Sequence, residues 1–404
     1  MPNRDILIFL GAGASKAADN RFPLVNEFFQ KAGELIKGLP PGAPSTRREP
    51  NDPFWRFLFK ADSKGLWESE NRWPQYTPSI VSIKNRCRGD RREFDDESKD
   101  WLSWTLSLNS GHAWTNIEHI VGKIEKLGVK AGGNNTRKAL HKFLIWLFSR
   151  LEQEAQLNYR ETPHAKLIHS LSETGLLSRT VFVSFNYDLV LERSMRALDE
   201  PQRHFWQGIT GYGCEWPGYY SMREGRFIKG RVMPSSDEKT LILKPHGSLA
   251  WLRSGDDIFP IADDRDANGP CAGVPMDNKD LENIIAQGAW DPVIIAPGKI
   301  KRMAGKHSWD TWKVLQRLLT NEIRKVVIIG WNVPETDEDI KNRITRFIDD
   351  RKIDNIIEKL VVCDIKGEDA FVDKMSMLFM PARTTRLLGG FENDAEKIAG
   401  ELIG

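Results

Sequence analysis

The sequence contains few cysteines, and none of them forms a close pair. Its 404 residues include four cysteines, at Cys87, Cys214, Cys271 and Cys363. Because no Cys-x-x-Cys pair occurs, neither a disulfide framework nor a zinc ribbon is indicated. The histidines show no metal-ligand spacing either, and we therefore predict no metal site.

Long apolar runs and an excess of one charge are also missing. No stretch approaches the roughly 20 apolar residues of a membrane span, and the first residues lack the pattern of a signal peptide. We therefore expect a cytoplasmic protein without membrane contact. The sequence has 58 lysines and arginines against 56 aspartates and glutamates, a formal charge of +2, so its composition does not indicate contact with nucleic acid.

A glycine motif opens the chain, and it consists of Gly11, Ala12, Gly13, Ala14 and Ser15. It follows the apolar run Ile6–Leu10, which is typical of a buried strand. Two glycines one residue apart allow a sharp turn and a close approach to a ligand. A helix that begins at Ala14 or Ser15 would direct its free N–H groups toward a phosphate. Taken alone, the motif also fits a structural turn, because Lys16 replaces the third glycine of the dinucleotide fingerprint.

Short apolar runs alternate with helical patterns in the second half of the chain. The predicted strands are Thr180–Phe185, Leu241–Leu243, Pro292–Ala296, Lys325–Ile329, Leu360–Cys363 and Arg386–Leu388. Strands that alternate with helices are typical of a parallel sheet. We predict an α/β protein whose Rossmann-like parallel sheet carries helices on both faces, formed by residues 1–39 and 176–404.

The middle of the chain, residues 40–175, has a different character. It begins with a proline-rich segment, 40–53, followed by tryptophans beside a charged run over 84–100 that we expect to be solvated. Fourteen tryptophans are many for this length; we expect most in the core and some at a homo-oligomer interface, where aromatic side chains are enriched. A helical pattern follows, from a capping box at Thr115–Glu118 onward. We predict a mainly helical insertion over residues 40–175.

Several polar residues and glycines lie just past the predicted strands. Besides the glycine motif, they are Asn186, His246, Ser248, Gly330 and Asn332. In an open α/β sheet, ligands bind outside the carboxyl ends of the strands. We therefore predict that these residues line one pocket.

Four motifs together resemble the sirtuin-like family, most closely the bacterial NAD-consuming branch used in defence against phage. They are Gly11–Ser15, Phe185–Asp188, Lys244–Ser248 and Gly330–Asp337, in the order of the family. The resemblance implies that the first motif holds the NAD pyrophosphate, and that Asn186 and His246 act at the nicotinamide ribose. It also implies cofactor contacts from the later motifs, at Gly247, Ser248, Gly330, Trp331 and Asn332. NAD would be the substrate, and a HerA-like ATPase would be the partner in trans.

The chemistry of NAD cleavage gives reasons for these roles. Breaking the nicotinamide glycosidic bond develops oxocarbenium character at the ribose, as in sugar hydrolysis. His246 is suited to be a general base because imidazole titrates near neutral pH. Asn186 can fix a water or a hydroxyl with its amide. Asp188 either acts at the developing cation or caps the helix that follows it.

Two departures from the deacylating sirtuins favour hydrolysis. The chain cannot build their four-cysteine zinc ribbon, and Arg21–Leu24 stands where they carry Asp-Phe-Arg. We expect an NAD hydrolase that depletes NAD in antiviral defence. Two alternatives stay open: an ADP-ribosyltransferase or zinc-free deacylase, and a module that senses NAD or ADP-ribose without chemistry.

Overall fold

The structure is a computed structural model, and the chain divides into two compact units. It describes residues 4–24, 147–148, 150–152, 154–199, 205–234, 240–254, 257–265, 273–287, 291–294, 305–332, 338–351, 356–364 and 369–403. One unit comprises Met1–Phe22, Leu151–Ile295 and Lys301–Gly404, and the other comprises Pro23–Arg150 and Ala296–Ile300. Nearly all of the second unit, including the predicted helices before residue 147, lies outside the described residues. The account below therefore concerns the first unit.

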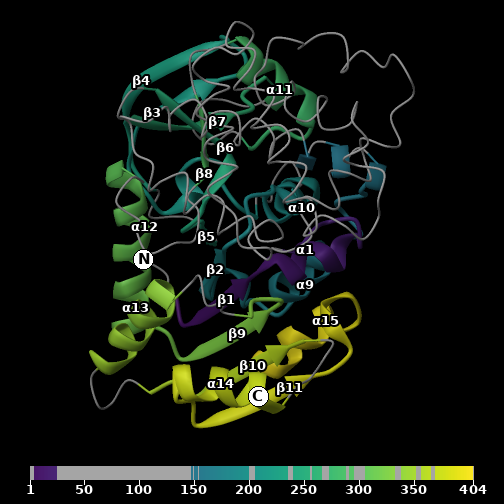
Figure 1. Ribbon diagram of the computed structural model, residues 1–404, viewed down its shortest axis with the longest axis vertical. Helices are drawn as coiled ribbons and strands as arrows, with labels where there is room; N and C mark the ends of the chain where they lie inside the picture. The colour runs from purple at the N-terminus through teal and green to yellow at the C-terminus, as the bar shows by residue number, and fades with distance from the viewer. Residues whose placement is uncertain are drawn as a thin grey trace, which may run out of the picture. The chain divides into compact units, whose positions relative to one another are not determined.

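A six-stranded parallel sheet forms the centre of this unit (Figure 1). Its strands are β1 (Ile6–Leu10), β2 (Thr180–Ser184), β5 (Leu241–Leu243), β9 (Lys325–Ile329), β10 (Lys359–Cys363) and β11 (Arg383–Leu387). All neighbours pair in parallel, in the order β5-β2-β1-β9-β10-β11. Numbered by their own chain order, these strands run 3-2-1-4-5-6, which is the order of a Rossmann sheet.

Helices cover both faces of the sheet. On one face lie α12 (Gly305–Asn321), α13 (Glu338–Asp349) and α14 (Asp369–Phe379), and on the other lie α1 (Ala12–Ala18), α9 (Pro163–Glu173) and α15 (Gly390–Ile403). Successive side chains of a strand point to opposite faces, so Leu7 and Phe9 of β1 join the cluster under α12 to α14. Ile6 and Ile8 point the other way and are equally buried. This double burial explains why the strands are apolar throughout.

A second, mixed sheet completes the unit. Its strands are β3 (Trp216–Ser221), β4 (Arg226–Val232), β6 (Gly247–Ser254), β7 (Asp257–Ala262) and β8 (Asp291–Ile294), in the order β4-β3-β7-β6-β8. An aromatic cluster packs beneath it, in which the Trp251 ring lies 5.0 Å from Trp216 and 5.2 Å from Tyr212 in edge-on arrangements. Among the tryptophans whose side chains the structure describes, Trp206, Trp216, Trp251, Trp312 and Trp331 are all buried.

The remaining described elements lie between these strands and helices along the chain. They are α10 (Val190–Leu198), α11 (Asn278–Gln287) and the short 3-10 helices Leu177–Arg179 and Thr210–Tyr212. Among the described helices, none is long and apolar enough to span a membrane.

The predicted α/β class with a Rossmann-like sheet is confirmed, but the mixed sheet was not predicted. The strand expected over Pro292–Ala296 is β8, which belongs to that second sheet. The predicted insertion of residues 40–175 also differs from the observed division, because α9 packs against α1, α10 and α15 within the sheet unit. Arg21 donates a side-chain hydrogen bond to the carbonyl of Glu154. The points where the chain leaves and re-enters this unit therefore lie side by side.

Candidate functional site

The carboxyl ends of four neighbouring strands meet at one edge of the parallel sheet. There, β1 leads into Gly11, β2 into Phe185, β5 into Lys244 and β9 into Gly330. The strand order reverses between β1 and β9, and dinucleotides bind at this switch point in Rossmann folds. The sequence prediction that these strand ends share an edge agrees with this arrangement.

The glycine motif packs closely against the end of β9. The amide of Gly11 donates to the carbonyl of Ile329 and that of Gly13 to the carbonyl of Gly330, both at 3.0 Å. A Cβ on Gly11 would lie 2.4 Å from the Gly330 oxygen, and one on Gly13 would lie 2.8 Å from the Gly330 Cα. Glycine is therefore required at both position 11 and position 13.

The helix after this motif begins earlier than predicted. It starts at Ala12 with Gly11 as its N-cap, and not at Ala14 or Ser15. The amide of Ala14 donates to the Gly11 carbonyl at 2.9 Å. The amides of Gly11, Gly13 and Ala14 are thus hydrogen-bonded within the protein, which removes them from the donors that the sequence assigned to a phosphate.

A buried chain of hydrogen bonds joins three of the predicted residues. The side-chain amide of Asn186 donates to the Gly11 carbonyl and to the Ser15 hydroxyl oxygen, both at 2.8 Å. The Ser15 hydroxyl donates in turn to Asp188 Oδ2 at 2.7 Å. Ser15, Asn186 and Asp188 are all buried. The glycine motif of β1 and the loop after β2 therefore form one polar unit.

The sequence offered Asp188 as the cap of the helix that follows it, but the N-cap of α10 is Leu189, and Asp188 lies one residue before it. Its second oxygen, Oδ1, accepts from the amide of Val190, the first residue of α10, at 3.1 Å. Both carboxylate oxygens are therefore engaged, one by the start of α10 and one by Ser15.

His246 lies in the turn between β5 and β6, and its side chain is buried. Its ring centroid is 5.1 Å from that of Phe185 and 6.2 Å from that of Tyr187. The amide of Leu249 donates to the Tyr187 carbonyl at 3.0 Å, which fastens β6 to the same loop. The structure therefore places His246 beside the loop that carries Asn186.

Four further predicted residues have different surroundings. Gly247 and Ser248 are the first residues of β6, paired with Ile294 and Val293 of β8, and are both buried. Trp331 is also buried, with its ring stacked 4.6 Å from Phe185. Asn332 is exposed. Gly247, Ser248 and Trp331 therefore have packing roles in this structure.

Lys244 and Glu192 form a buried ion pair close to the carboxyl edge of the parallel sheet. The sequence analysis did not predict this ion pair. Lys244 Nζ lies 2.9 Å from Glu192 Oε1 and donates to the Asp188 carbonyl at 2.6 Å. Both side chains have no exposed surface. The Tyr212 hydroxyl also donates to Glu192, at 3.3 Å, and burial together with the Glu192 charge raises the pKa of Tyr212. The sequence did contain a signal for this ion pair, because Lys244 follows directly after the buried strand β5.

A second buried pair, Arg193 with Glu152, lies next along α10. Arg193 also donates to the Pro275 carbonyl and to Asn278 Oδ1, both at 2.8 Å. Burial raises the pKa of Glu152, against the charge of Arg193, and the charge of Asp188 adds to the rise. Two adjacent charged residues of one helix are therefore buried, and each needs its partner.

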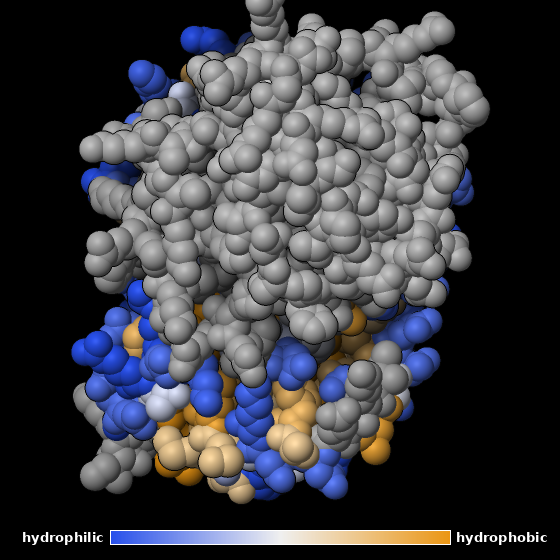
Figure 2. All heavy atoms as spheres, in the orientation of Figure 1, coloured by the Kyte–Doolittle hydropathy of each residue, from blue (hydrophilic) through white to orange (hydrophobic). Residues whose placement is uncertain are grey.

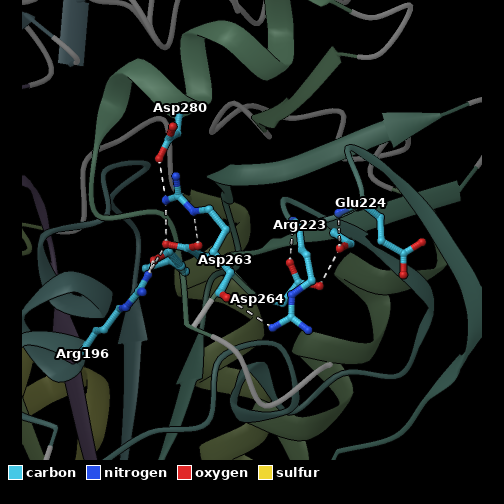
Figure 3. A network of polar contacts seen from close by, with 9 residues as sticks. Arg196, Arg223, Glu224, Asp263, Asp264 and Asp280 are labelled. Carbon is cyan, nitrogen blue, oxygen red and sulfur yellow. Dashed lines mark hydrogen bonds and ion pairs between the residues drawn. The ribbon is translucent and has the colours of Figure 1, made fainter. Parts of the chain in front are cut away.

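Asp263 and Asp264, at the end of β7, form a third polar network (Figure 3). Asp263 accepts from Arg196 of α10 and from Arg265, while Asp264 accepts from the amide of Arg223. Burial alone would raise the pKa of Asp263, but the hydrogen bonds from Arg265 and Arg196 lower it below its usual value. The network fastens α10 to the mixed sheet.

Within the described residues, no group of histidine, cysteine, aspartate or glutamate side chains is arranged to hold a metal ion. The polar side chains that converge at the sheet edge are those of Ser15, Asn186, Asp188 and His246. Their chemistry suits a ligand with hydroxyl groups. No protein-family profile matches this sequence, and no curated protein matches it either.

Proposed function

We propose that this protein hydrolyses NAD to nicotinamide and ADP-ribose at the carboxyl edge of its parallel sheet. One observation carries the proposal: Asn186, Ser15 and Asp188 are hydrogen-bonded at the switch point of a 3-2-1-4-5-6 sheet, with His246 beside them. The resemblance of the four motifs to sirtuin-like NAD-consuming proteins supports the same assignment.

In this mechanism, Asn186 positions the attacking water or a ribose hydroxyl. Its amide is held by the Gly11 carbonyl and by Ser15, so its orientation is fixed before substrate arrives. His246 takes the proton as general base. The water oxygen bonds to the ribose carbon as the glycosidic bond to nicotinamide breaks, through a transition state with oxocarbenium character.

The burial of these side chains adds a step to the proposal. Asn186 and His246 are 9% and 3% exposed, so the edge has to open before a dinucleotide can reach them. An enzyme that drains NAD needs such restraint. We propose that opening accompanies self-assembly or binding of a HerA-like ATPase, in a role in antiviral defence, as the resemblance implies.

The test is nicotinamide release from NAD by the purified chain, alone and with the candidate ATPase. We expect Asn186→Ala and His246→Ala to lower the rate by roughly 10²–10⁴. The matched control is His169→Ala, because His169 is an exposed histidine on α9. Rates of nicotinamide release that stay equal to wild type in both Asn186→Ala and His246→Ala would contradict the proposal.

Two further readouts separate the alternatives. Transfer of label from NAD onto protein would identify an ADP-ribosyltransferase instead. Binding of ADP-ribose without turnover, in every assembly state, would identify a sensor.

A further inference from the structure

Lys244 and Glu192 are unusual because their charged side chains have no exposed surface. Charged side chains are almost never fully buried, and Figure 2 shows many hydrophilic residues on the described surface that faces the viewer. A buried ion pair is also weak evidence for stability, because the cost of taking two charges out of water can exceed their attraction. The position of this pair beside the candidate catalytic residues therefore indicates a role besides stability.

The Lys244 side chain connects the turn that carries His246 with the loop that carries Asn186. The turn begins at Lys244 and is closed by a hydrogen bond from the Gly247 amide to the Lys244 carbonyl at 3.0 Å. From this turn, Lys244 Nζ donates to the carbonyl of Asp188, which lies 2.6 Å away and two residues after Asn186. One buried side chain therefore fastens the two segments to each other.

Glu192 of α10 holds this connection in place. It accepts from Lys244 Nζ at 2.9 Å and from the Tyr212 hydroxyl at 3.3 Å. Burial raises the pKa of Tyr212, the charge of Glu192 adds to the rise, and a hydrogen bond with Ser248 opposes it. Lys244 and Ser248 stand two residues before and two residues after His246. The His246 turn is therefore held on both sides by contacts that lead to Glu192.

We propose that Lys244 is a positioning residue that sets the distance between His246 and Asn186, a role that rests on the NAD hydrolysis proposed above. In that reaction, the general base and the amide that positions the water must meet the same substrate. A misplacement of about 1 Å can lower such a rate by about 10²-fold. Lys244 acts through these two residues and does not contact the substrate itself.

The double variant Lys244→Met, Glu192→Leu tests the proposal. It removes the hydrogen bond to the Asp188 carbonyl, and it removes both charges together so that neither is left unpaired in the interior. We expect the folded variant to release nicotinamide from NAD with a kcat about 10²-fold below that of wild type. KM should stay close to the wild-type value, because Asn186 and His246 are still present. A wild-type kcat in this folded variant would overturn the proposal.

A second variant, Lys244→Gln with Glu192→Gln, serves if the first one does not fold. Its two side-chain amides can bond to each other, but glutamine is one bond shorter than lysine and carries no charge. The same fall in kcat is expected, and a wild-type kcat would again overturn the proposal.

The matched control is Lys359→Met, the same substitution at the opposite edge of the sheet. Lys359 is the first residue of β10, and its buried ammonium lies 2.8 Å from Glu401 Oε2. It therefore lies at the amino edge, away from the carboxyl edge that carries His246. We expect the wild-type kcat here. A kcat as low as that of the double variant would show that the loss of any buried lysine lowers the rate, and would overturn the proposal.

Crystal structures of wild type and of the double variant supply a measurement that does not depend on catalysis. We expect the distance between the Asn186 side chain and the His246 ring to differ by about 1 Å or more between the two proteins. If even the wild type releases no nicotinamide, the proposed hydrolysis fails, and this distance still tests Lys244. A changed distance would support the positioning role, and an unchanged distance would overturn it.

Discussion

At the scale of single residues, Gly330 completes the close backbone contact that requires glycine at positions 11 and 13. It has a positive φ of +58°, and a Cβ there would lie 2.4 Å from the Ala14 nitrogen and 2.5 Å from the Gly13 carbonyl carbon. Its absent side chain lets the end of β9 contact the start of α1. The motif that the resemblance assigned to the NAD pyrophosphate is therefore a packing contact between two strand ends.

We predict that Gly330→Ala destabilises the fold by roughly 2–4 kcal/mol, because a left-handed backbone costs about 1–2 kcal/mol and the clash adds to it. Gly175→Ala is the matched control, since Gly175 has a φ of +71° and no atom within 4 Å of its added Cβ. It should show only the backbone cost. Chemical denaturation measures both, and equal losses would show that the contact with Ala14 carries no energy.

At the scale of secondary-structure elements, α10 joins the site to its surroundings through charge. Glu192 binds Lys244 after β5, Arg193 binds Glu152, and Arg196 binds Asp263 after β7. Helix periodicity after β2 predicted this helix, but nothing in its pattern indicated that Glu192 and Arg193 would be fully buried. Local periodicity reports which residues share a helix face, whereas the burial of charges depends on partners distant in sequence.

We predict that Lys244→Met destabilises the chain by about 3–5 kcal/mol, because it leaves Glu192 charged and unpaired in the interior. The double variant Lys244→Met, Glu192→Leu should recover most of this loss, because no buried charge is left without a partner. Thermal and chemical denaturation of both variants provide the measurement. A double variant as unstable as the single one would show that the hydrogen bond to the Asp188 carbonyl, and not the ion pair, is what Lys244 contributes.

At the scale of the whole molecule, the parallel sheet was the predictable part. Its strands β2, β9 and β10 are short apolar runs buried on both faces, so their apolar composition was enough to predict them as strands. The mixed sheet was missed because β4 is mostly exposed and β3 mixes glycine, proline and aromatic residues. At the site, the sequence placed Asn186 and His246 near one edge, but it could not reveal that both are closed off by packing.

The stability of the sheet unit should depend on pH through His164, a buried residue of α9 whose ring packs edge-on against Phe391 of α15 at 5.0 Å. Burial lowers the pKa of His164 to about 4, with Lys244 adding to the effect and Asp188 opposing it. An unfolded histidine titrates near 6.5, so between these values the unfolded chain binds more protons than the folded one, and stability falls as the pH falls.

We predict that His164→Phe, which keeps an aromatic ring against Phe391, flattens the fall in melting temperature between pH 6.5 and pH 4. The buried carboxyl of Glu152 acts in the opposite direction, because its raised pKa makes the folded chain bind the extra proton, and it is present in both proteins. His169→Phe, at an exposed position of the same helix, should keep the wild-type slope. Melting curves at half-unit pH steps measure this, and identical slopes in wild type and His164→Phe would show that His164 does not govern acid unfolding, leaving carboxylates whose pKa is lowered in the folded chain, such as that of Asp263, as its cause.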